Sequence, residues 1–142
     1  MKKIYYIAEI NLPSKSAYSI HVMKMCDAFK KGGHNVNLLI YNHLNNSNVY
    51  KKYNCEKKFP ISDFFRSKKN FFLKRIFFSI KIFIYFICIN KYDFILSRSI
   101  LSAICLSIFK KNIFLEIHHE LSGFTKIVFN ITKKFSFFER II

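Results

Sequence analysis

The chain has 142 residues, with 24 Lys and Arg against 8 Asp and Glu, which gives a formal net charge of +16. This length suits a single domain, and a hydrophobic fraction of 51% excludes an intrinsically disordered chain despite the charge. Ile, Lys, Phe, Asn and Tyr, which all have A/T-rich codons, make up more than half of the residues. Because codon bias explains much of the Lys excess and no recognition motif is present, we expect no specific nucleic-acid partner.

The first part of the chain predicts a βαβ unit. It begins with an apolar strand at 3–10 and a polar loop at 11–16. A helix with one apolar stripe follows at about 17–31, and a second apolar strand at 35–41. Ser16 or Ser19 can cap the helix, and the Gly32-Gly33 pair can stop it. Such a unit predicts parallel strands joined by a right-handed crossover.

The rest of the chain continues to alternate between helices and strands. The pattern predicts a helical turn at 49–54, a long basic helix at 71–90, and two further helices at 99–110 and 123–138. It predicts an edge strand at 59–64, strands at 92–97 and 112–117, and the start of a last strand at 139–142. Continuous apolar strands alternating with helices indicate an α/β fold: a Rossmann-like, doubly wound, mostly parallel sheet with helices on both faces.

The spacing of the cysteines and the hydropathy of the sequence indicate the cellular compartment of the protein and its relation to membranes. The four cysteines form no CxxC pair, and three of them lie in apolar segments, so we expect free thiols and a cytoplasmic protein. The one membrane candidate is 71–89, whose purest apolar run, 76–89, contains Lys81 and is shorter than the about 20 residues of a span. The segment 71–89 is therefore predicted to form a core or interfacial helix and not a membrane span.

Ligands of doubly wound sheets bind beyond the carboxyl ends of the strands, near the point where the strand order reverses. Three of the predicted strand ends carry polar side chains. The candidate substrate-binding residues follow these strands: Ser14, Lys15, Ser16, Ser19 and His21 after the first, Arg98 after 92–97, and His118, His119 and Glu120 after 112–117.

The chemistry of these residues suits anions and hydroxyl groups, although each has a plain structural alternative. The imidazole of His118 or His119 can bind a sugar hydroxyl or a phosphate oxygen, and Glu120 can accept a proton; otherwise these are loop residues bonded to nearby backbone. Serines before a helix N-terminus can hold a phosphate or only cap the helix. Arg98 can bind an anion or only cover a helix end.

Several familiar sites are not expected. The three glycines form neither a GxGxxG nor a phosphate-binding P-loop motif, and no GxSxG motif occurs. The remaining histidines are far apart in the sequence, so we expect no metal site.

The segments 13–25, 28–29 and 32–36 resemble the opening of family 4 glycosyltransferases, and 92–99 and 115–120 are similar to later strand ends of that family. The resemblance implies one half of a GT-B fold, in which two Rossmann-like domains face each other across a cleft. It also implies that Ser14 to Ser19 border the acceptor and the donor phosphate, and that His118 is the catalytic residue near the reacting sugar.

The sequence departs from that family in two ways. Many members have a Gly-Gly pair where this chain has Ser16-Ala17, and the donor-binding domain with glutamates eight positions apart has no counterpart. Residues 1–142 therefore resemble the N-terminal, acceptor-side domain alone, and a truncated gene, a split enzyme and a relic are all compatible with this.

Two functions follow as expectations. The first is the acceptor-binding part of a retaining glycosyltransferase for surface polysaccharide or glycolipid, inactive as this chain alone. Its partners would be a sugar or lipid-linked acceptor, a nucleotide-sugar co-substrate and a donor-domain chain, with no cofactor. The second is a peripheral membrane module whose basic helix at 71–89 lies on anionic lipid, with contacts from Lys68, Lys69, Lys74, Arg75 and Lys81.

Overall fold

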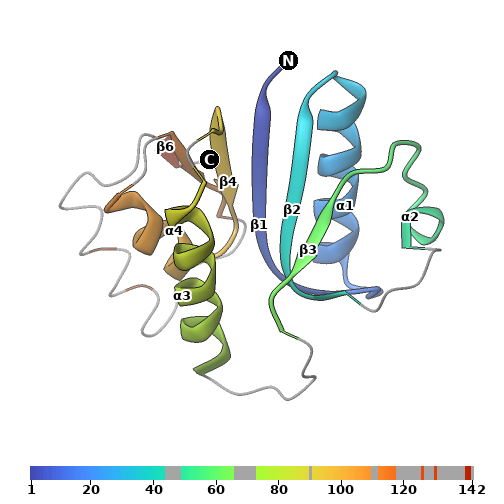
Figure 1. Cartoon of the computed structure of the whole chain (residues 1–142). Helices are drawn as coiled ribbons and strands as arrows, with labels where there is room; N and C mark the ends of the chain where they lie inside the picture. The colour runs from blue at the N-terminus through green and yellow to red at the C-terminus, as the bar shows by residue number, and fades with distance from the viewer. Residues whose placement is uncertain are drawn as a thin grey trace.

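The computed structural model describes residues 1–43, 49–65, 73–89, 91–109, 112–117, 126, 130 and 140–141. Its centre is a six-stranded sheet in the order β3-β2-β1-β4-β5-β6, in which every neighbouring pair is parallel (Figure 1). The strands are β1 (Lys3–Leu12), β2 (Asn35–His43), β3 (Ile61–Asp63), β4 (Phe94–Ser97), β5 (Ile113–Leu115) and β6 (Arg140–Ile141). The predicted Rossmann-like α/β fold is confirmed, and the strand order reverses between β1 and β4.

Helices cover both faces of the sheet. They are α1 (Ala17–Lys31), α2 (Val49–Lys52), α3 (Leu73–Ile87) and α4 (Ile100–Ser107). Side chains of β1 alternate between two buried clusters, one packed under α1 and the other under α3 and α4. Right-handed crossovers explain this division, because β1 to β2 runs in one direction across the sheet and β3 to β4 to β5 runs in the other.

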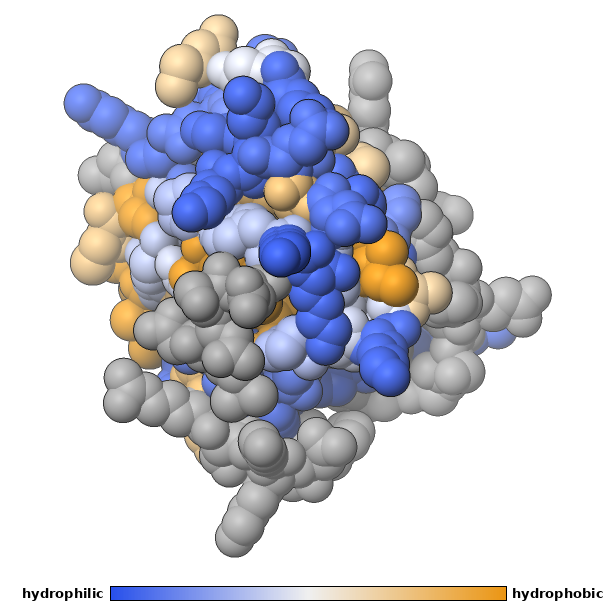
Figure 2. Space-filling model, turned by 90° about the vertical axis from the view of Figure 1, so that its right-hand side faces the viewer, coloured by the Kyte–Doolittle hydropathy of each residue, from blue (hydrophilic) through white to orange (hydrophobic). Residues whose placement is uncertain are grey.

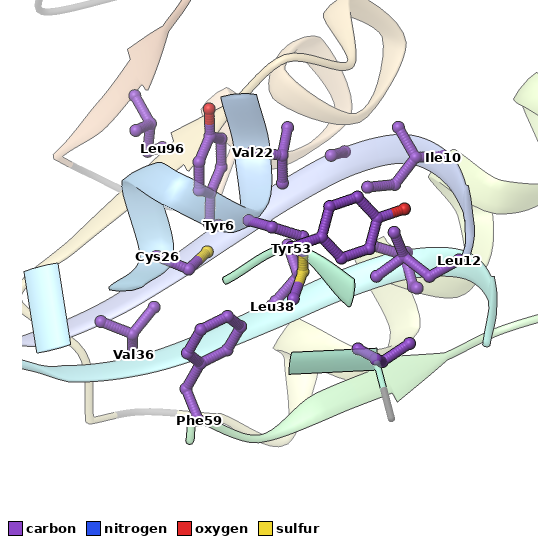
Figure 3. Close-up of a cluster of buried hydrophobic side chains, with 14 of the residues drawn as sticks. Tyr6, Ile10, Leu12, Val22, Cys26, Val36, Leu38, Tyr53, Phe59 and Leu96 are labelled. Carbon is purple, nitrogen blue, oxygen red and sulfur yellow. The ribbon is translucent and has the colours of Figure 1, made fainter. Parts of the chain in front are cut away.

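Figure 3 shows the buried cluster on the α1 face, which contains both aliphatic and aromatic side chains. Tyr6 of β1 lies beside Val22 and Cys26 of α1 in this view, and all three are fully buried. The other labelled side chains come from β1, β2, β4 and the segment after α2: Ile10, Leu12, Val36, Leu38, Tyr53, Phe59 and Leu96. Burial of this apolar surface fixes α1 against β1 and β2.

The bounds of α1 follow from its caps. Ser16 is the N-cap, and its side chain accepts a hydrogen bond from the backbone N–H of Ser19. Lys30 and Lys31 occupy the last turn, where positive charge is favourable, and Gly33 takes a left-handed φ of +79° just beyond the helix. Of the two capping serines that the sequence allowed, Ser16 is the one that caps.

The other predicted elements that fall within the described residues are present, with shifted ends. The second strand was predicted at 35–41, but Asn42 and His43 extend β2; residues 44–48 lie outside the described part. Of the helix predicted at 123–138 only Lys126 and Asn130 are described, and both are helical. The strand expected at the end of the chain appears as β6.

The basic helix predicted at 71–90 is α3, and its charges do not all face solvent. Lys74 is only 4% exposed, and its Nζ lies 4.8 Å from the ring centroid of Tyr41. Lys81 donates to the carbonyl oxygen of Phe64, and Arg75 is paired with Glu9. Within the described ranges we find no helix with the length and apolar character needed to cross a bilayer.

The exposed side of α3 is largely apolar, although Arg75 and Lys81 are exposed as well. Six large side chains on this helix are at least one-third exposed: Leu73, Ile76, Phe77, Ile80, Ile84 and Ile87. We call these six residues the α3 stripe. The side of the molecule that carries α2 differs, because it is mostly hydrophilic and its hydrophobic residues show only in small, separate areas (Figure 2).

Candidate functional site

A polar cluster lies at the carboxyl ends of β4 and β5, next to the reversal of strand order. Arg98 directly follows β4, and its backbone N–H donates to the carbonyl oxygen of Ile7 in β1. Glu116 directly follows β5, and its backbone N–H donates to the carbonyl oxygen of Ser97. The main chain thus holds both residues at the edge of the sheet where α/β proteins bind their ligands.

Glu116 is the centre of this cluster. Its Oε2 accepts a hydrogen bond of 2.6 Å from the hydroxyl of Tyr6, and its Oε1 lies 3.2 Å from Nε2 of His21 in α1. The Nε of Arg98 is 3.8 Å from Oε2. The side chain of Glu116 is only 9% exposed, so these partners compensate for the cost of burying its charge.

Arg98 is buried beside Glu116. Its side chain is 7% exposed, and its guanidinium carbon lies 4.3 Å from the ring centroid of Tyr18. Stacking of this kind is typical of arginine, whose planar group is weakly hydrated. Its Nη1 is buried and has no hydrogen-bond partner among the described residues. A buried guanidinium N–H without an acceptor is costly, so this atom is available to a ligand oxygen.

The two tyrosines of the cluster are neutral hydrogen-bonding groups. Burial, together with the bond to Glu116, raises the pKa of Tyr6 far above its usual value. Burial also raises the pKa of Tyr18 to about 12, although Arg98 acts in the opposite direction. Tyr6 therefore remains a proton donor to Glu116 at neutral pH, and neither phenol acts as a base there.

The serines of the first loop bond to one another. Ser14 Oγ donates to Ser16 Oγ over 3.2 Å, and Ser16 Oγ lies 2.8 Å from Ser19 Oγ. The hydroxyl of Tyr53 donates to the carbonyl oxygen of Ser14 and accepts from its N–H. Ser19 is buried, whereas Lys15 is exposed. This network fits the capping interpretation of the loop, and Lys15 is its solvent-facing cation.

A second acidic group lies on the opposite face of β1. Glu9 accepts from Nε of Arg75 at 2.7 Å and from Oγ of Ser99 at 2.6 Å. It stands where the pairing of β1 with β2 shifts register, between Ala8 and Asn11. Irregularities of this kind are frequent beside functional sites because they redirect side chains. Glu9 joins β1 to α3 and to the N-cap of α4.

The structure thus brings together two of the predicted site residues, His21 and Arg98, from segments 77 positions apart. Ser14, Ser16 and Ser19 form a separate network in the first loop. The residues predicted after β5, namely His118, His119 and Glu120, lie outside the described residues, so their predicted roles stay predictions.

The acidic and phenolic partners are not among the predicted site residues. Glu116 belongs to the predicted strand at 112–117, Glu9 and Tyr6 to the strand at 3–10, and Tyr18 to the helix at about 17–31. The sequence does contain one indication of the two carboxylates. Glu9 and Glu116 each interrupt a run of apolar residues, and a carboxylate in a buried strand needs partners to offset its desolvation.

Metal binding finds no support in the described ranges, where no three His, Cys, Asp or Glu side chains are grouped in a way that could hold an ion. No protein-family model matches the chain, and no curated protein matches its sequence.

Proposed function

We propose that this chain is the acceptor-binding domain of a retaining glycosyltransferase that uses a nucleotide-sugar donor, in surface-polysaccharide or glycolipid assembly. The observation that carries the proposal is the cluster of Arg98, Glu116 and His21 at the strand-order reversal of a Rossmann-like sheet. Ligands of such sheets bind at this position. The sequence segments that resemble family 4 glycosyltransferases include all three residues.

The charges of the cluster favour a sugar acceptor over the donor diphosphate. Arg98 lies 3.8 Å from the Glu116 carboxylate, so the two opposite charges largely offset each other. A diphosphate is bound by several cations or free N–H groups, whereas a sugar needs alternating donors and acceptors. Nη1 of Arg98 can donate, the Glu116 oxygens can accept, and the 43% exposed side chain of His21 can reach a ligand from solvent.

The donor would be held elsewhere, by a second domain or a partner chain facing this edge of the sheet. Ser14 to Ser19 would border the donor phosphate, and His118 would take the catalytic role that the resemblance implies. His119 and Glu120 would contribute to the same edge. The protein would then act on the cytoplasmic side of the membrane, where nucleotide sugars and lipid-linked acceptors meet.

Direct binding of sugars tests the proposal. A panel of methyl glycosides is titrated into the protein and followed by NMR, because weak sugar complexes shift resonances in fast exchange. We expect Arg98→Gln to weaken binding by about tenfold, since it removes a buried charged donor. Arg98→Lys should weaken it less, and Lys24→Gln serves as the matched control because, among the described residues, its Nζ donates to the carbonyl oxygen of Asn54.

Either of two results would contradict the proposal. One is a panel in which no glycoside binds to the folded protein. The other is equal weakening by Arg98→Gln and Lys24→Gln, with circular dichroism showing both variants folded. Sugar transfer in the presence of a donor-domain partner, lost in His118→Ala, would extend the support to the catalytic role.

A second candidate function is peripheral membrane binding through α3, favoured by the exposed α3 stripe. The predicted contacts change, because Lys74 is buried and Arg75 is paired with Glu9, while Lys68 and Lys69 lie outside the described residues. Apolar insertion, not lysine contacts alone, would bind the helix to lipid. Ile80→Gln with Ile84→Gln should then reduce co-sedimentation with anionic vesicles, and unchanged co-sedimentation would exclude α3.

A further inference from the structure

A cavity of about 430 Å³ lies on the α1 face of the sheet, next to the polar cluster. Its walls are apolar side chains of α1, β4 and β5, and Lys2 and Glu116 are its charged members. The apolar lining residues are Met25, Phe29, Phe94, Leu96, Phe114 and Ile117. The rings of Phe29, Phe94 and Phe114 meet edge to face, at centroid distances of 6.4 and 5.7 Å.

Chain topology explains why the described helices leave this surface open. The right-handed crossovers that lead to β4 and β5 place α3 and α4 on the opposite face. On the cavity's face, α1 packs chiefly against β1 and β2, and no other described helix contributes to the lining. Aromatic side chains of β4 and β5 are therefore left only partly buried beside α1.

The cavity and the polar cluster share a residue. Glu116 lines the cavity and also contacts Tyr6, His21 and Arg98. Phe94 and Lys2 lie at the amino end of the sheet, whereas Glu116 lies at the carboxyl end, so the cavity runs along the strands and ends at the cluster. Its volume is in the range of small-molecule sites, which are mostly apolar with a few polar groups.

We propose that this cavity binds the apolar chain of an amphipathic acceptor, whose sugar end lies at Arg98, Glu116 and His21. The inference deepens the proposed function and rests on it: the acceptor class becomes a glycoside of an aliphatic or isoprenoid chain. Apolar walls bind the chain by removing it from water, and the polar cluster orients the hydroxyl end.

Decyl glycosides, compared with the methyl glycosides of the same sugars, test this inference. Both series are titrated by isothermal calorimetry below the micelle-forming concentration. We expect the decyl compound to bind about tenfold more tightly or better, because burial of several methylene groups adds affinity. Met25→Arg, which places a charge in the cavity wall on a partly exposed helix position, should remove this advantage and leave methyl glycoside binding unchanged.

The matched control is Ile84→Arg, which makes the same kind of change in the α3 stripe on the other face of the sheet. It should keep the decyl advantage. Met25→Gln, which is close in volume to the native side chain, should weaken the advantage, and it tests the cavity if Met25→Arg does not fold.

Three outcomes would overturn the inference. The decyl and methyl series can bind equally, or the advantage can be lost in Ile84→Arg and kept in Met25→Arg, which would assign it to the α3 stripe. The third is concentration-dependent dimerisation in sedimentation that Met25→Arg abolishes, since a second copy would then cover the cavity. Failure of the methyl series to bind at all would count against the proposed function instead.

Discussion

Arg75, near the start of α3, donates from its Nε to Oε2 of Glu9 in β1 over 2.7 Å, although the two residues are 66 positions apart. The other carboxylate oxygen of Glu9 accepts from the hydroxyl of Ser99, the N-cap of α4. The side chain of Glu9 is 11% exposed and that of Arg75 is 45% exposed. One largely buried carboxylate therefore joins a central strand to α3 and α4, which pack on the same face.

This unequal burial predicts an unequal response to mutation. Arg75→Met leaves a buried carboxylate without its cation, so we expect the free energy of unfolding to fall by about 2 kcal/mol. Glu9→Gln leaves an arginine that can reach water, so we expect a loss of about 1 kcal/mol. Urea unfolding of both variants and of the double variant gives the coupling free energy between Glu9 and Arg75. Equal and additive losses would show that the pair contributes nothing specific.

The strands and helices were predictable because each follows from local pattern. Apolar runs such as 35–41 form buried strands, the stripe of α1 faces the sheet, and Ser16 and the glycines bound that helix. The strand order also follows in outline, since a βαβ unit with right-handed crossovers allows few arrangements. The ends of the elements were less predictable: β2 continues through Asn42 and His43, beyond the predicted end of this strand at residue 41.

The partners within the site were not predictable, because they depend on long-range packing. Glu116 meets His21 across 95 positions and Tyr6 across 110, and no local pattern indicates either pair. The burial of Lys74 was not predictable for the same reason. Its position in a basic helix suggests an exposed side chain, but the packing of its apolar neighbours sets the rotation of the helix and buries Lys74 over the ring of Tyr41. Arg98 was identified from its position after a strand, which the topology rule makes informative.

Ser16 separates helix capping from anion binding in the first loop. Ser16→Ala should lower the free energy of unfolding by about 1 kcal/mol, because the N–H of Ser19 loses its acceptor. Ser16→Asp should restore stability, since Asp is an equally good cap and its charge favours the helix N-terminus. If the loop also holds a phosphate, Ser16→Asp should abolish stabilisation by inorganic phosphate in thermal unfolding. Retained phosphate stabilisation would place that anion elsewhere.

Asp27 of α1 predicts a pH dependence of stability. Burial acts to raise the pKa of this carboxyl, but the N–H of Lys57 and the ammonium of Lys31 outweigh it and hold the pKa below its usual value. The folded state thus favours the ionised form. This contribution is complete above the unfolded-state pKa of about 4 and is lost as the pH falls through the lower folded value.

Asp27→Asn should therefore be less stable than the native protein at neutral pH and should lose less stability between about pH 5 and pH 3. Urea unfolding across this range measures both effects. Glu56→Gln is the control, because Glu56 also contacts Lys31 but its side chain is 74% exposed. A native-like pH profile in Asp27→Asn would contradict the assignment.

We expect the isolated chain to transfer no sugar. Transfer requires stabilisation of the leaving diphosphate by preorganised cations and N–H groups, which contribute several kcal/mol. In the described residues the one buried guanidinium, Arg98, is offset by Glu116, and the first-loop serines bond to one another. The purified chain, assayed with nucleotide sugars and decyl glycosides, should give no product, whereas addition of a donor-domain partner should produce turnover that Arg98→Gln reduces. Turnover by the chain alone would mean that these residues hold the donor as well, and the acceptor-domain assignment would then be wrong.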